Sequence, residues 1–67
     1  MNREQIVKIL DLKNRGQHTG IVKHKTLGKV RVKMCHYLSG YWNMALIEKP
    51  GKGNSWEYLE NLEEIND

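Results

Sequence analysis

The chain has 67 residues, and eleven Lys and Arg against eight Asp and Glu give it a net charge of +3 at pH 7. This length predicts a single domain spanning residues 1–67 with one modest core, because so short a chain buries only about 60% of its unfolded surface. Its single cysteine, Cys35, excludes an intramolecular disulfide framework, and no apolar run approaches the roughly 18 residues that span a bilayer. A reducing, cytoplasmic location is therefore expected, and the start at Met1 with a polar Asn-Asp end is typical of a complete small reading frame.

The first sixteen residues favour an amphipathic helix. Asn2 and Gln5 have the spacing of a capping box, and Gly16 stands where a C-terminal cap is expected. The segment from Ile6 to Leu10 also has the β content of a strand, although it lacks strict alternation. A strand therefore remains the alternative, and residues 14–18 predict a connecting loop in either case.

The next stretch, residues 19–34, predicts a β-hairpin, because two runs rich in β-branched residues flank Thr26, Leu27 and Gly28. A two-residue loop would mix charge and hydrocarbon on both faces, whereas a three-residue loop with Gly28 in the left-handed conformation sorts them. Burial should select the sorted register. The cross-strand pairs that it predicts are Lys25 with Lys29, Lys23 with Arg31, Val22 with Val32, and His24 with Val30.

This register gives the hairpin one apolar and one basic face. The basic face consists of Lys23, Lys25, Lys29, Arg31 and Lys33. Such a face is either a binding surface or a solvated surface that resists aggregation, and the sequence leaves both open. Residues 57–67, by contrast, carry five acids and no base. This separation of charge along the chain suits steering of an anionic partner toward the basic face, or head-to-tail self-association.

The second half of the chain predicts more β structure. Residues 37–40 indicate a turn, and residues 41–48 a third strand with Met44 and Leu46 sharing one face. This strand is apolar on both faces and is therefore expected to be central or covered on both sides. Residues 49–54, which contain the only proline, predict an exposed turn. The end, SWEYLENLEEI, is either a helix capped by Ser55 or a strand followed by a turn and a closing edge strand.

The order GIVK, a short turn, GKVRV, a late Trp and LENLEEI resembles the small SH3-like barrels of the KOW and Tudor kind, over Thr19 to Ile65. In those barrels an aliphatic-glycine hairpin is followed by a closing segment of this type. The helix-like N-terminus and the long YLSGYWNMALI segment depart from that pattern. The resemblance implies binding of peptides, proteins or nucleic acid.

The sequence predicts neither a metal site nor catalysis, and no obligatory cofactor. His18, His24, Cys35 and His36 match no structural zinc spacing. Adjacent strand residues such as Cys35 and His36 face opposite ways and form no thiolate–imidazole pair, so we expect Cys35 to be a small core residue.

The predicted function is that of a small binding protein that docks through the basic face, with Tyr37 and Tyr41 as neighbouring aromatics. It would act as an inhibitor or adaptor of a larger protein, and small frames of this kind are common on phages and other mobile elements. The alternative is a nucleic-acid-binding protein, because cations beside aromatic platforms suit single strands and RNA loops. For that alternative, Lys13 and Arg15 would extend the basic face from the neighbouring loop.

The predicted fold is mainly β, a small antiparallel SH3-like sheet or barrel with an N-terminal amphipathic helix. The alternative is an α+β fold with helices at both ends of a three-stranded meander. The core is predicted to contain Ile6, Ile9, Leu10, Val22, Val30, Val32, Met34, Met44, Leu46, Leu59, Leu62 and Ile65.

Overall fold

The computed structural model describes residues 1–35 and 42–65. One helix precedes a five-stranded antiparallel sheet, in which the strand order is β4-β3-β2-β1-β5. The elements are α1 (Arg3–Asn14), β1 (Ile21–His24), β2 (Gly28–Cys35), β3 (Met44–Lys49), β4 (Gly53–Tyr58), the 3₁₀ helix η2 (Leu59–Asn61) and β5 (Leu62–Glu63). The fold is therefore mainly β with an N-terminal helix, as predicted, and the closing-strand reading of the C-terminal segment is correct.

The N-terminal segment is a helix, as its capping signals predicted. The backbone N–H of Gln5 donates to Asn2 Oδ1 at 2.9 Å, and the N–H of Asn2 donates to Gln5 Oε1 at 2.8 Å. This capping box satisfies backbone donors that the first turn leaves unpaired. Beyond the last turn, Gly16 has a φ of +73°, which suits glycine at a helix end. None of the described helical segments combines the length and apolar character that crossing a bilayer requires.

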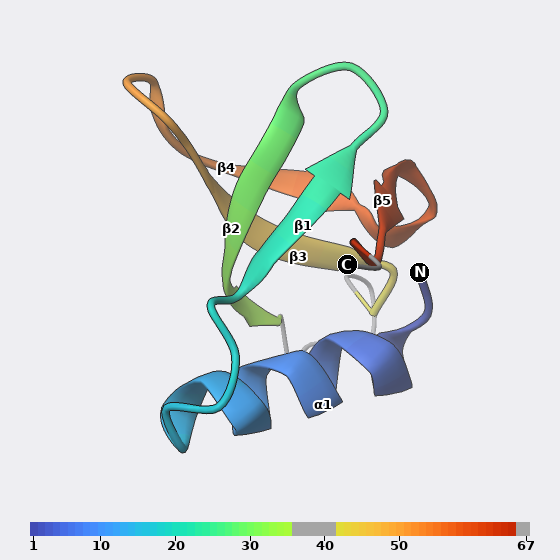
Figure 1. Ribbon diagram of the computed structural model, residues 1–67. Coiled ribbons are helices and arrows are strands. Elements are labelled where there is room, and N and C mark those ends of the chain that lie inside the picture. Colours follow the sequence, from blue (N-terminus) through green and yellow to red (C-terminus); the bar gives the residue numbers. More distant parts are fainter. Residues whose placement is uncertain (36–41, 66–67) are drawn as a thin grey trace.

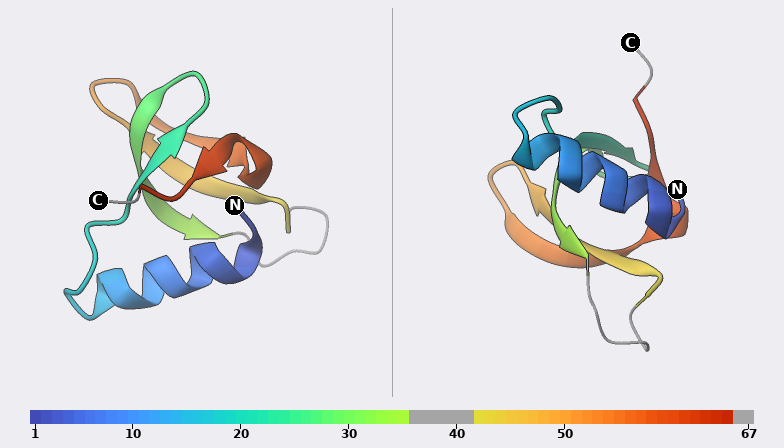
Figure 2. Two further views of the ribbon diagram at one scale, coloured as in Figure 1. Left: turned by 45° about the vertical axis from the view of Figure 1, so that its right-hand side comes forward. Right: turned by 90° about the horizontal axis from the view of Figure 1, so that it is seen from below.

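The sheet is strongly curled, so that the β1–β2 hairpin crosses the β3–β4 hairpin (Figure 1). The side chains of His24 in β1 and Glu57 in β4 meet at 3.1 Å, although β2 and β3 separate their strands in the sheet. The helix α1 lies across one end of the curled sheet (Figure 2). The enclosed core consists of Ile6, Ile9, Val22, Val30, Val32, Cys35, Ala45, Ile47, Leu59 and Leu62, with Met1 and Leu10 packed against it.

The hairpin register differs from the predicted one by two residues. Val22 pairs with Val30 and Lys23 with Lys29, so the loop is residues 25–27 and not residues 26–28. Because the shift is even, the paired residues 21–24 and 29–31 keep their predicted faces. Gly28 has a φ of +75°, as expected for the left-handed position, but it is the first residue of β2 and pairs with His24.

The imidazole of His24 explains why the turn starts one residue early. Its Nδ1 accepts hydrogen bonds from the backbone N–H groups of Thr26 at 3.1 Å and Leu27 at 3.3 Å. The ring is 4% exposed, and its Nε2 lies 3.1 Å from Glu57, whose other oxygen accepts from Ser55 at 2.8 Å. The side chain therefore supplies, through Nδ1, an acceptor that the tight turn lacks.

A β-bulge at Lys33 makes the prediction for Met34 wrong. Val32 pairs with Ile47 and Met34 with Leu46, so that Lys33 is the extra residue in β2. An inserted residue reverses the alternation that follows it. Met34 is consequently 44% exposed, while Cys35 is turned into the core, where it was expected.

The core-facing side of β3 is also opposite to the predicted one. Ala45 and Ile47 are fully buried, whereas Met44 and Leu46 are only half-buried on the other side. Both faces are apolar, so hydrophobicity alone could not choose between them. Ile65, likewise placed in the predicted core, is half-buried beyond the end of β5. β3 lies between β2 and β4, as its two-sided pattern predicted.

Candidate functional site

The outer face of the sheet, meaning the side turned away from the core, carries the candidate site. Side chains that pair across neighbouring antiparallel strands point to the same side, so the register defines this face in rows. One row is Ile21, Arg31, Glu48 and Asn54, a second is Met34, Leu46 and Trp56, and a third is Met44 and Tyr58. Charged and apolar side chains thus occupy adjoining parts of one surface.

The five predicted cations are all exposed, but they do not form one uniform face. Lys23, Lys29 and Arg31 share the outer face. Lys25 lies in the hairpin turn, and Lys33 is the bulge residue. The two predicted aromatic neighbours, Tyr37 and Tyr41, lie outside the described residues.

Two acids reach the charged part of the outer face from other strands. Glu48 of β3 lies 3.7 Å from the Arg31 guanidinium and 3.8 Å from the Lys33 ammonium. Glu63 of β5 lies opposite Lys23 in the strand register. The hairpin sequence alone contains no acid, so this partial neutralisation depends on strand pairing. Both Glu48 contacts exceed hydrogen-bond distance and join exposed groups, so they are loose ion pairs.

Lys13 adds a cation to the same region from α1. Its side chain passes over Gly20, and its ammonium donates to the carbonyl oxygen of Val32 at 3.1 Å. Burial lowers the pKa of Lys13 from 10.5, and the charges of Lys33 and Arg31 lower it further. Lys13 therefore lies near Arg31 and Lys33, whereas Arg15 pairs with Asp11 on the helix at 3.4 Å.

The apolar part of the outer face was not found from the sequence. Met34 of β2 is 44% exposed, and Trp56 and Tyr58 of β4 are 38% and 48% exposed. The half-buried Met44 and Leu46 lie on β3, between these two strands. The sequence pattern placed Met34 in the core, so this surface was missed. The bulge that turns Met34 outward has no clear sequence signal. The apolar residues on both faces of β3 could have revealed it, because the face turned away from the core must then be covered by another part of the chain or by a binding partner.

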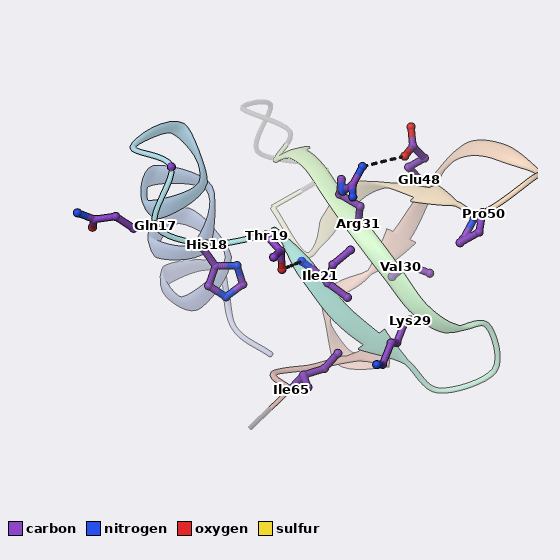
Figure 3. Close-up of a pocket in the computed structure, with 11 residues that line it drawn as sticks. Gln17, His18, Thr19, Ile21, Lys29, Val30, Arg31, Glu48, Pro50 and Ile65 are labelled. Carbon is purple, nitrogen blue, oxygen red and sulfur yellow. Dashed lines mark hydrogen bonds and ion pairs between the residues drawn. The ribbon is translucent and has the colours of Figure 1, made fainter. Parts of the chain in front are cut away.

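An open hollow of about 940 Å³ adjoins the charged row (Figure 3). Its walls come from the α1–β1 connection, β1, β2, the end of β3 with the β3–β4 turn, and the C-terminal segment. The lining residues are Gly16, Gln17, His18, Thr19, Ile21, Lys29, Val30, Arg31, Glu48, Pro50 and Ile65. The hollow therefore combines cationic, neutral polar and aliphatic groups.

His18 has a defined role in the hollow. Its Nδ1 accepts a hydrogen bond from the backbone N–H of Gly20 at 2.8 Å, which leaves the ring proton on Nε2. His18 thus offers a donor to a ligand. Within residues 1–35 and 42–65, no three His, Cys, Asp or Glu side chains converge as a metal site would require.

Comparison of the chain with known protein families, with curated proteins and with solved structures returned no match.

Proposed function

We propose that the protein is a non-enzymatic binding module that docks on a larger protein through the outer face of its sheet, as an inhibitor or adaptor. The observation that carries the proposal is the exposure of Met34, Trp56 and Tyr58 beside the exposed Arg31. Aromatic residues, methionine and arginine are enriched at protein–protein interfaces, and tryptophan, tyrosine and arginine dominate their binding energy.

The charge distribution favours a protein over nucleic acid. A nucleic-acid backbone presents a continuous series of negative charges and is bound by neutralising them. Glu48 and Glu63 interrupt the cations of the outer face, which disfavours such a backbone there. The second candidate, nucleic acid, is supported by the exposed Lys23, Lys25 and Lys29 around the hairpin tip.

An SH3-like barrel is the proposed fold family. Two observations support it: β5 returns to pair with β1, as the closing segment of the resemblance requires, and the sheet is curled enough to bring β1 side chains against β4. Folds of this kind mostly bind peptides, proteins or nucleic acid, which by analogy suits a binding module.

The test is affinity capture from the native host with matched surface variants. Met34→Glu places a charge in the apolar part of the outer face, whereas Val7→Glu places one on α1 at a residue of similar exposure, 49% against 44%. We expect a stoichiometric protein that survives nuclease treatment, is retained by Val7→Glu and is lost with Met34→Glu, because a buried unpaired carboxylate opposes association.

Two outcomes contradict the proposal. If nuclease releases the captured material, the second candidate function is correct. If Met34→Glu captures the same protein as the wild type, the apolar part of the outer face is not the docking surface. Circular dichroism of both variants establishes that they are folded.

A further inference from the structure

We propose that the hollow beside Arg31 binds an acidic peptide segment that carries an aliphatic side chain between carboxylates. The inference rests on the proposed function, because it specifies the part of the protein partner that the hollow accepts. It concerns a site next to the apolar part of the outer face, and it can fail while docking through Met34 remains correct.

Arg31 provides the main donor for a carboxylate. Its guanidinium carries five N–H groups in a planar fork, and its ion pair with Glu48 is 3.7 Å long between half-exposed groups. This loose contact leaves the fork able to donate two parallel hydrogen bonds to a ligand. Lys29 and the Nε2–H of His18 add donors at the same hollow.

Aliphatic side chains line the hollow as well. Ile21 is half-buried, and Pro50 and Ile65 come from the β3–β4 turn and the C-terminal segment (Figure 3). A purely ionic ligand would leave this apolar surface in water. A ligand that joins carboxylates to one aliphatic side chain satisfies both kinds of lining, because burial of apolar surface adds to the ionic contacts.

Glu48 discriminates between kinds of anion. It lines the hollow beside Arg31, so its carboxylate repels any negative charge of a ligand that is placed next to it. The carboxylates of a peptide are separate and can be placed around Glu48, whereas the phosphates of a nucleic-acid strand follow one another without gaps. The same residue also competes with the ligand for Arg31. Its neutralisation should therefore tighten binding of an acidic peptide.

The experiment is fluorescence anisotropy with the full chain and a fluorescein-labelled peptide that has glutamates on both sides of one leucine. We expect saturable binding that weakens when glutamine replaces the glutamates and when glycine replaces the leucine. Arg31→Gln should weaken binding by about tenfold, from the loss of one charge-assisted pair. Lys8→Gln, which removes one exposed cation from α1 away from the hollow, is the matched control and should leave affinity nearly unchanged. Glu48→Gln should strengthen binding.

Three results would overturn the inference. They are absence of saturable binding, equal weakening by Arg31→Gln and Lys8→Gln, and tighter binding of a labelled oligothymidylate that also depends on Arg31. If the labelled peptide does not bind while Met34→Glu still abolishes capture of the partner, the inference is wrong and the proposed function stands. If Met34→Glu has no effect on capture but the peptide binds through Arg31, the docking surface is limited to the hollow.

Discussion

His24 joins the tip of the first hairpin to the opposite strand of the sheet. Its Nδ1 accepts two backbone N–H groups of the turn, so its hydrogen is on Nε2, which is directed at Glu57. Ser55 donates to the other oxygen of that carboxylate. A histidine on an apolar strand face was expected from the hairpin pattern, but its partner was not, because Glu57 is 33 residues away in the sequence.

Replacement of His24 tests this network. His24→Ala should lower the free energy of unfolding by about 2 kcal/mol, because two turn N–H groups and Glu57 lose their partner. His24→Asn places an oxygen close to the Nδ1 position and should cost less, roughly 1 kcal/mol, because only the contact with Glu57 is lost. Urea unfolding followed by tryptophan fluorescence measures both. Equal losses for the two variants would show that the turn N–H groups do not depend on this acceptor.

Within β2, a single bulge decides which side chains form the outer face. If Lys33 were a regular ladder residue, alternation from Val32 would turn Met34 into the core and Cys35 out of it. Because Lys33 is the extra residue, Met34 lies outside and Cys35 inside, as they would if Lys33 were absent. Burial also raises the pKa of the Cys35 thiol, against the opposing influence of Arg3. Its alkylation should therefore be slow in the folded protein, since the thiolate is the reactive form.

Deletion of Lys33 should preserve the protection of Cys35, because it removes the extra residue and leaves a regular ladder. Deletion of Arg31, at a regular position, should speed alkylation because every following residue changes face. The measurement is the rate of iodoacetamide modification by mass spectrometry under native conditions. Fast alkylation after deletion of Lys33 would mean that this residue is part of the ladder.

The helix α1 is attached to the sheet by Lys13 as well as by the core. The stem of Lys13 covers Gly20, which has a φ of +80°. A Cβ at Gly20 would lie 2.8 Å from Lys13 Cδ, so the lysine stem would have to move to make room for it. The ammonium reaches the Val32 carbonyl of β2. An exposed-looking lysine in a helix pattern thus belongs to the helix–sheet contact, which periodicity alone does not reveal.

The pKa of Lys13 should be measurably below 10.5 in the folded protein, because burial and the charges of Lys33 and Arg31 disfavour its ammonium form. Folding lowers this pKa, so the unfolded chain binds the proton more tightly, and stability should rise with pH between the folded value and 10.5. Glu48→Gln should lower the pKa further, since Glu48 raises it. NMR titration of the Lys13 side chain tests both, and Asp11→Asn is the control because Asp11 pairs with Arg15. An unchanged pKa in Glu48→Gln would contradict the proximity of the two groups.

At the scale of the whole molecule, local signals could be read from the sequence and long-range ones could not. The capping box of Asn2 and Gln5 and the apolar alternation of Val30 and Val32 act within a few residues, and both were predicted. The face of β3 that meets the core depends on how the sheet curls, and the pattern around Ile47 is apolar on both sides. The candidate site was found only in part for the same reason. Its lysines lie within one short stretch of sequence, whereas Glu48 and the apolar residues of β4 are brought beside them only by strand pairing.

The two-residue strand β5 has a consequence for how ligands act on this fold. It closes the sheet against β1 from the far end of the chain, with few hydrogen bonds to resist local opening. Ile21 and Ile65 line the same hollow on the two sides of this seam. A ligand that contacts both residues would therefore hold β5 against β1. Binding of a partner would then oppose local opening of β5 and raise the thermal unfolding midpoint of the entire domain.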